Sequence, residues 1–348
     1  MACFLTRKSA ILRKVLISSI VLLVILVPRC YAKCAFEAIF NFGDSNSDTG
    51  GFYAAFPSQP SPNGMTYFSK PTGRPTDGRL YIDFLGRFQH FSVNQMKQFK
   101  AKVEEFKSQE QTNLPQPDIF GKALYTIYIG QHDITYDVAA VGAGGVKQYE
   151  PQIASEIANA IKELHRLGGR TFLVLNLAPI GCYAAVLTQV SHDSSDIDPS
   201  GCMMSFNNAV REYNSVLKET LQQTRQELHH ANVIYVDTHS VLLELYQNPT
   251  SHGMQHGITA CCGHGGGTYN FNPQVFCGNT KEIDGQRVTA SACSDPQNYV
   301  SWDGIHLTEN ANKMMAYAIL SGSYFDPPFS LISIVIFNPL VDVIIVIT

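Results

Sequence analysis

The fold of this chain is decided by the stretch Phe36-Glu37-Ala38-Ile39-Phe40-Asn41-Phe42, which runs directly into Gly43-Asp44-Ser45-Asn46-Ser47-Asp48-Thr49-Gly50. The first seven residues form a short apolar run, which predicts a buried strand. The second segment places Ser45 at the carboxyl end of this strand, where we expect a helix to begin. Because a helix N-terminus presents free backbone N–H groups that can bind an oxyanion, the position suits a nucleophilic serine.

Two other interpretations of this segment are open. Ser45 can be the N-cap residue of a turn, which is the commoner role of a serine at such a position. The acidic and amide side chains of the segment also alternate as calcium ligands would. The sixth position of that loop is Thr49 rather than Gly, and the twelfth is Ala55 rather than Glu. This mismatch argues against a calcium site.

The rest of the chain alternates short apolar runs with amphipathic helices. Further strands are predicted over Leu124–Ile129, Thr171–Leu177 and Val233–Val236. One helix carries an apolar stripe from Ile153 to Leu164, and another runs from about Ser205 to His230. This alternation predicts an α/β fold in which a parallel sheet lies between two layers of helices, with ligands bound at the carboxyl ends of the strands.

The termini differ in character from the region between them. Residues 1–32 have the three parts of a secretory signal: basic residues, the apolar run Val15–Val27, and small residues that end at Ala32. The run is shorter than the roughly 20 residues of a membrane span. We therefore expect a signal peptide over 1–32, one domain over 33–330, and an atypical apolar tail over 331–348, whose polar interruptions argue against a stable membrane span.

Charge and cysteine usage restrict the function further. The formal net charge is −4, and no stripe of Lys and Arg is present, which excludes the usual footprint of a nucleic-acid-binding protein. Seven of the nine cysteines lie beyond the signal, which favours disulfides in an oxidising, extracellular compartment. A zinc site is not expected, since adjacent Cys261 and Cys262 suit one tetrahedral ion poorly. The irregular loop Thr259–Tyr299 is expected to be held by disulfides.

A second candidate segment lies near the other end of the chain, in Ser301-Trp302-Asp303-Gly304-Ile305-His306-Leu307-Thr308. A serine nucleophile needs a base that takes its proton and a carboxylate that orients the base. Asp303 and His306, three residues apart in one tight turn, can supply both groups. The alternative is an ordinary helix-entry turn capped by Thr308.

The order of these segments along the chain resembles the plant GDSL esterase/lipase family of the SGNH hydrolase superfamily. The matching blocks are Gly43–Gly50, Gly73–Gly86, Gly130–Asp133, Asn176–Cys182, Cys261–Gly267, Cys293–Asn298 and Trp302–His306. The resemblance implies a three-layer α/β/α fold with a mainly parallel, flavodoxin-like sheet. It implies Ser45 as nucleophile, His306 as general base and Asp303 as its orienting acid, in an esterase or lipase that forms an acyl-enzyme. The expected partner is a small ester or acylated substrate, with neither cofactor nor metal.

This chain departs from the family pattern in two blocks that supply oxyanion donors. His132 stands where relatives carry Asn, so the oxyanion candidates are the N–H of Ser45 and the ring of His132. After Gly86 the chain passes almost directly to Asn94, and it omits several dozen residues that relatives carry, including a Gly donor and a strand. A catalytically impaired or vestigial secreted binding protein is therefore the alternative function.

Residues outside the proposed triad also have expected roles. The expected disulfides join Cys182 to Cys202, and join the pair Cys261 and Cys262 to Cys277 and Cys293 in one of two arrangements, leaving Cys34 over. The His264–Gly267 stretch is expected to belong to the disulfide loop, because no Gly-x-Ser-x-Gly accompanies it. The charged side chains of Arg74, Asp77 and Arg79 are expected to fix a loop by hydrogen bonds rather than to bind substrate.

Overall fold

The computed structural model of the chain describes residues 36–51, 59–86, 93–106 and 115–331. The expected signal, Cys34 and the tail beyond Leu331 lie outside these residues. At the centre is a five-stranded sheet in which the first four strands are parallel and the last is antiparallel to its neighbour. In spatial order the strands are β1 (Ala38–Gly43), β2 (Ala123–Tyr128), β3 (Thr171–Leu175), β4 (Asn232–Val236) and β9 (Phe325–Asp326).

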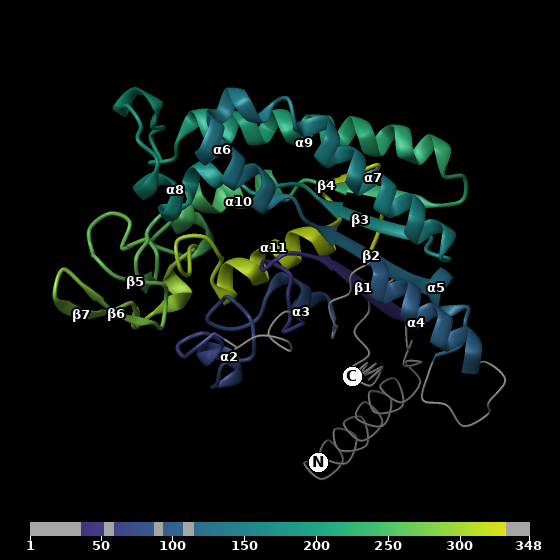
Figure 1. Cartoon of the computed structure of the whole chain (residues 1–348), viewed down its shortest axis with the longest axis horizontal. Helices are drawn as coiled ribbons and strands as arrows, with labels where there is room; N and C mark the ends of the chain where they lie inside the picture. The colour runs from purple at the N-terminus through teal and green to yellow at the C-terminus, as the bar shows by residue number, and fades with distance from the viewer. Residues whose placement is uncertain (1–35, 52–58, 87–92, 107–114, 332–348) are drawn as a thin grey trace, which may run out of the picture.

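Helices cover both faces of this sheet (Figure 1). On one face lie α6 (Gln131–Val146), α7 (Glu150–Arg166) and α9 (Met204–Glu227). On the other lie α3 (Tyr81–Leu85) and α11 (Glu309–Ser321), and α10 (Thr238–Gln247) packs against α11. The predicted three-layer α/β/α architecture is thus confirmed. None of the described helices is both long enough and apolar enough to cross a membrane.

The predicted strands are all present, with small changes at their ends. Every side chain of β2 and β3 is buried, as their continuous apolar runs require. β3 ends at Leu175 rather than at Leu177, because the backbone N–H and C=O of Leu177 bond to the side chain of Asn214 on α9 instead of to a strand. At Leu177 the side-chain amide of Asn214 takes the place of the backbone hydrogen bonds of the sheet.

The prediction of a helix directly after β1 is wrong. Residues 44–47 form a turn instead, closed by the N–H of Ser47 donating to the C=O of Asp44 at 3.0 Å, and the described residues up to Gly51 contain no helix. The cause is local: Asp44 Oδ1 accepts the N–H of Asn46 at 2.9 Å, and Asp48 Oδ1 accepts the N–H of Gly50 at 2.9 Å. Such side-chain acceptors compete with the helical pattern.

β1 lies at an edge of the sheet. In the part of the chain that the structure describes, it pairs only with β2, as expected if a strand region is absent. Phe40 on this strand packs against α4 (Val93–Phe106), where its ring centroid lies 6.2 Å from that of Phe99. Phe40 also stacks on Phe120 at 6.0 Å.

The late loop is built around two disulfides and two small antiparallel sheets. One sheet pairs β5 (Cys262–Gly263) with β8 (Ser291–Ala292), and the other pairs β6 (Thr280–Ile283) with β7 (Gln286–Thr289). The structure joins Cys261 to Cys293 and Cys262 to Cys277, which is one of the two arrangements left open, and it joins Cys182 to Cys202. The remaining short helices are α2 (Met65–Phe68), α5 (Ile119–Lys122) and α8 (Ala184–Gln189).

The charged residues after Gly73 hold this part of the chain to α3 and α11. Arg74 donates two hydrogen bonds to Asp83, both at 2.7 Å. Arg79 pairs with Glu309 at 2.7 Å, and Asp77 accepts the N–H of Glu309 at 2.6 Å. All three side chains are therefore engaged with the protein itself, as the loop-fixing interpretation predicts.

Candidate active site

Ser45 is held in its turn by buried polar contacts to the sheet. The side-chain amide of Asn41 donates to the C=O of Ser47 at 2.7 Å, and the hydroxyl of Thr126 donates to Asn41 Oδ1 at 2.9 Å. Asn41 and Thr126 are both fully buried, on β1 and β2 respectively. These bonds attach the turn to two neighbouring strands, so the position of Ser45 is set by the rigid sheet.

The sheet also approaches this turn too closely for a side chain at Gly43. A Cβ atom there would lie 2.1 Å from Ser47 Oγ and 2.4 Å from the C=O of Tyr128. The N–H of Asp44 donates to that same C=O at 3.3 Å. The glycine at the end of β1 is therefore required by the close packing of the turn on β2.

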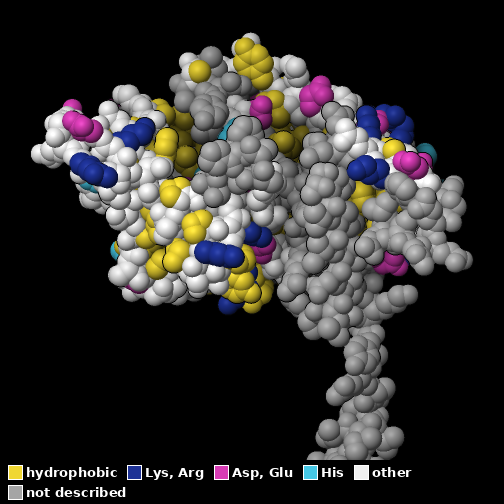
Figure 2. Space-filling model, turned by 60° about the horizontal axis from the view of Figure 1, so that its bottom comes forward, with side chains coloured by type: hydrophobic (Ala, Val, Ile, Leu, Met, Phe, Trp, Pro, Cys, Tyr) yellow, Lys and Arg dark blue, Asp and Glu magenta, His cyan; other side chains and the backbone are white. Residues whose placement is uncertain are grey.

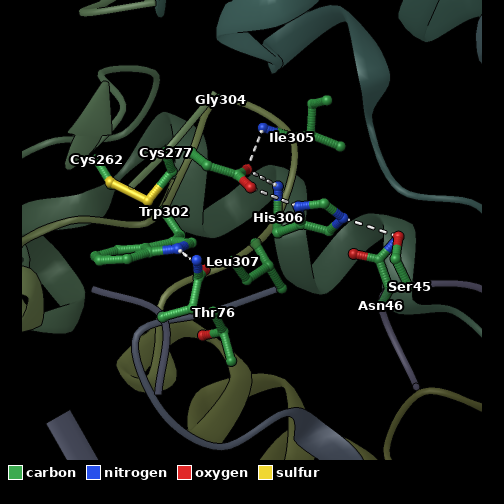
Figure 3. A network of polar contacts seen from close by, with 12 residues as sticks. Ser45, Asn46, Thr76, Cys262, Cys277, Trp302, Gly304, Ile305, His306 and Leu307 are labelled. Atoms are coloured by element: carbon green, nitrogen blue, oxygen red, sulfur yellow. Dashed lines mark hydrogen bonds and ion pairs between the residues drawn. A yellow bond between two sulfur atoms is a disulfide. The ribbon is translucent and has the colours of Figure 1, made fainter. Parts of the chain in front are cut away.

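The structure brings Ser45, His306 and Asp303 together in one line of hydrogen bonds (Figure 3). Ser45 Oγ lies 2.8 Å from His306 Nε2, and His306 Nδ1 lies 2.7 Å from Asp303 Oδ2. The other oxygen, Asp303 Oδ1, accepts the backbone N–H of Ile305 at 3.1 Å and that of His306 at 2.8 Å. The carboxylate thus holds both the ring and the backbone of the histidine.

The turn that carries Asp303 and His306 is closed by its own backbone. The N–H of Trp302 donates to the C=O of His306 at 2.7 Å, and the N–H of Gly304 donates to Ser301 Oγ at 3.1 Å. Gly304 has φ = 93°, and a Cβ atom there would lie 2.6 Å from the Phe271 ring. Glycine thus satisfies both the left-handed backbone and the tight contact.

The helix-capping interpretation of this segment also holds. Thr308 is the N-cap of α11, and its side chain accepts the N–H of Ala311 at 3.2 Å. The cap and the Asp303–His306 turn occupy adjacent parts of the loop and do not compete.

The environment shifts the pKa values of the two ionisable partners in opposite directions. Burial raises the pKa of Asp303, but the charge of His306 and the hydrogen bonds from His306 and Ile305 together outweigh burial and hold this pKa below its ordinary value. Burial lowers the pKa of His306, but the negative charges of Asp303 and Asp44 and the Asp303 hydrogen bond outweigh it, so this pKa is raised. The histidine is therefore a stronger base than a free imidazole.

The two oxyanion candidates are placed differently. The backbone N–H of Ser45 donates to no acceptor within the described residues, so it can bind an incoming oxygen. His132 is exposed in the first turn of α6, two residues after the N-cap Gly130. Its part in binding an oxyanion remains a prediction.

The calcium and zinc interpretations of the motifs find no matching cluster. Among the described residues, no group of three or more His, Cys, Asp or Glu side chains is placed to hold a metal ion. The His264–Gly267 stretch lies in the loop next to the Cys262–Cys277 disulfide, as expected.

Several residues important to the geometry were missed by sequence reasoning. Asn41 and Thr126 could have been noticed, because each is a polar residue inside an apolar strand. Asp44 was considered only as a calcium ligand, although its charge acts on His306. Asn63 gave no signal at all, since the side chain that it contacts, Trp302, is 239 residues away.

Comparison with known proteins agrees with this geometry. A model of the family described as GDSL-like Lipase/Acylhydrolase matches residues 39–319, well over half of the chain. The chain belongs to this family. Ser45, Asp303 and His306 all lie within the residues that the GDSL family model matches.

Three plant proteins illustrate the similarity. The GDSL esterase/lipase At4g01130 of Arabidopsis thaliana is 50% identical over 364 aligned positions, which cover 89% of this chain and 95% of that protein. The GDSL esterase/lipase At3g26430 of Arabidopsis thaliana is 37% identical, with 86% and 93% covered. Alpha-L-fucosidase 3 of Arabidopsis thaliana is 36% identical, with 85% and 94% covered.

The same alignments show that this GDSL chain lacks internal residues. Since 89% of 348 residues is about 310, an alignment of 364 positions holds about 54 positions that only the 50% identical relative occupies. The 37% identical relative gives a similar figure, since 86% of the chain is about 299 residues and its alignment has 355 positions. These gaps agree with the missing second block and with the edge position of β1.

Proposed function

We propose that this protein is a secreted carboxylic ester hydrolase that works through an acyl-enzyme on Ser45. The observation that carries the proposal is the pair of contacts at 2.8 Å and 2.7 Å that link Ser45 through His306 to Asp303. The GDSL family and its esterase/lipase relatives support the reaction class. Three disulfides within the described residues support secretion, because such bonds persist in oxidising compartments.

The proposed reaction has two halves. Ser45 Oγ attacks the ester carbonyl carbon while His306 Nε2 takes the hydroxyl proton, and Asp303 stabilises the resulting imidazolium. The carbon–oxygen bond to the alcohol then breaks, and His306 gives its proton to the departing alcohol. In the second half, His306 takes a proton from water, whose oxygen attacks the acyl-enzyme, and the acid leaves as Ser45 regains its proton.

The oxyanion formed in both halves needs donors placed in advance. The N–H of Ser45 supplies one, and His132 is proposed as a second. Removal of one such donor typically costs about 10² to 10³ in turnover. We therefore propose that turnover is weak compared with that of relatives that carry Asn at this position and the full second block.

A fluorophosphonate probe tests the assignment of the nucleophile. The wild-type protein should be labelled on Ser45, and both labelling and hydrolysis of p-nitrophenyl acetate should be lost in Ser45→Ala. His306→Ala should slow turnover by at least about 10³, because the hydroxyl loses its base. Ser47→Ala is the matched control, since Ser47 is in the same turn but has no contact with His306. Labelling that persists in Ser45→Ala would exclude Ser45.

The second candidate function is a secreted binding protein that has lost activity. The about 54 absent positions favour it, because the second block is expected to supply an oxyanion donor. Under this function, the probe would leave Ser45 unlabelled in correctly folded wild-type protein, and p-nitrophenyl butyrate would not be hydrolysed above the Ser45→Ala background.

A further inference from the structure

The chain contains one tryptophan, Trp302, which directly precedes Asp303. Its side chain is 1% exposed and packs in a small apolar cluster of its own, separate from the main core. The cluster is formed by Cys261, Cys262 and Cys277. Two disulfides that end on this cluster fix its walls covalently, so the indole ring lies against a rigid surface.

Each polar group of Trp302 makes a hydrogen bond, and Figure 3 shows the one from its indole N–H. Its indole Nε1 donates to Asn63 Oδ1 at 2.9 Å, and its C=O accepts the N–H of Cys262 at 2.6 Å. Its own N–H donates to the C=O of His306 at 2.7 Å. The residue therefore connects the disulfide loop on one side to the histidine on the other.

Asn63 completes the connection from the N-terminal part of the chain. It is 3% exposed, and its side-chain amide donates to the C=O of Pro60 at 2.9 Å. Its backbone N–H donates to the same oxygen at 3.2 Å. The amide oxygen that accepts the indole N–H is thus fixed in place.

We propose that Asn63 and Trp302 are positioning residues for the base, which hold the Asp303–His306 turn at the distance where His306 Nε2 meets Ser45. Neither side chain touches a reacting atom; each acts through the backbone of the turn. The inference rests on the proposed function. Without the Asn63 acceptor, the buried indole N–H has no partner in an apolar cluster, which favours rotation of the ring. The backbone N–H of Trp302 donates to the C=O of His306, so any backbone shift that accompanies this rotation also displaces the turn.

The test compares Asn63→Leu, Trp302→Phe and the double variant with the full-length wild type. Each single variant should lower kcat about tenfold or more while KM changes less than about twofold, because misplacement of a base affects the chemical step. The double variant should be no slower than the slower single variant, since both remove one hydrogen bond. The acid limb of kcat/KM should shift to lower pH, because a looser contact with Asp303 returns the raised pKa of His306 toward its ordinary value.

Two further measurements separate positioning from a loss of stability. Since Trp302 is the sole tryptophan, acrylamide quenching of its fluorescence should increase in Asn63→Leu, which reports the ring directly. Thr224→Val is the control: it removes a buried hydrogen bond to the C=O of Thr220 on α9. It should change stability but neither the pH profile nor the fluorescence. If Trp302→Phe fails to fold, Asn63→Leu alone decides.

The outcomes are distinct. Wild-type turnover that depends on Ser45, together with unchanged kcat, pH profile and quenching in Asn63→Leu, would overturn the positioning role alone. If Asn63→Leu and Trp302→Phe instead lose only stability, as Thr224→Val should, with no shift of the acid limb of kcat/KM, that result would also overturn the positioning role. A folded wild type without Ser45-dependent turnover would overturn the proposed function, and this inference with it.

Discussion

At the scale of single residues, two carboxylates act on the imidazole of His306. Asp303 contacts it at 2.7 Å, and Asp44 adds a further negative charge that raises its pKa. Asp44 belongs to the same turn as Ser45, and its carboxylate accepts the N–H and the side-chain amide of Asn46 at 2.9 Å and 3.2 Å. The turn that presents the proposed nucleophile thus also raises the pKa of its proposed base.

Asp44→Asn should therefore change the pH dependence of hydrolysis. The charge of Asp44 favours the protonated imidazole, so its removal lowers the pKa of His306, and the acid limb of kcat/KM moves to lower pH. The plateau rate should fall by about tenfold or less, because the imidazolium of the transition state loses one of two stabilising charges. Profiles of p-nitrophenyl acetate hydrolysis check this, with the exposed Asp193→Asn as control. A limb that stays in place would show that Asp44 does not act on His306.

At the scale of elements, the packing of β1 against β2 determines the position of the Ser45 turn. Apolar periodicity was enough to predict β1, β2, β3 and β4, because continuous burial leaves a clear pattern in the sequence. The turn after β1 could not be predicted, since the competition between a helix and the Asp44 and Asp48 acceptors depends on backbone geometry. Contacts such as Asn63 with Trp302 join distant segments, so local patterns carry no trace of them.

Gly43→Ala should destabilise the protein where the end of β1 packs against β2. The added methyl group would lie 2.4 Å from the C=O of Tyr128, a backbone atom that cannot move without disturbing β2. We expect the free energy of unfolding to fall by about 1–3 kcal/mol, measured by urea denaturation. Gly144→Ala in α6 is the control, because nothing lies within 4 Å of its Cβ position. That variant should match the wild type or exceed it by up to about 1 kcal/mol. Equal stability of Gly43→Ala and wild type would contradict the close-approach argument.

At the scale of the whole molecule, the sheet ends at β1 within the described residues, and the alignment with the 50% identical relative holds about 54 positions that this chain lacks. An edge strand exposes unpaired backbone groups, which favour association between chains. The three-layer fold nevertheless remains, because β1, β2, β3 and β4 pair with one another in parallel without interruption. We therefore expect the absent block to affect one edge of the sheet and one oxyanion donor.

Insertion of the corresponding segment of the 50% identical relative after Gly86 should raise both soluble yield and turnover. The segment would supply a partner for β1 and the missing donor, worth about 10² or more in turnover if the donor is correctly placed. A Gly/Ser insert of the same length is the control, because it adds length without a strand or a fixed donor. Measurements are the yield of secreted protein and kcat for p-nitrophenyl butyrate. Equal turnover of the original and restored chains would mean that the second block is dispensable here.

The distance along the chain between Ser45 and His306 has a consequence for biosynthesis. The two side chains that lie 2.8 Å apart are separated by 261 residues in the sequence. All four parallel strands are therefore translated before His306. A ribosome-bound chain that ends before His306 therefore carries Ser45 without its proposed base, and it should not react with a fluorophosphonate. Under the proposed function, reactivity should appear only once the segment that carries His306 has packed beside the Ser45 turn. A fluorophosphonate would then count only molecules in which both translation and folding are complete.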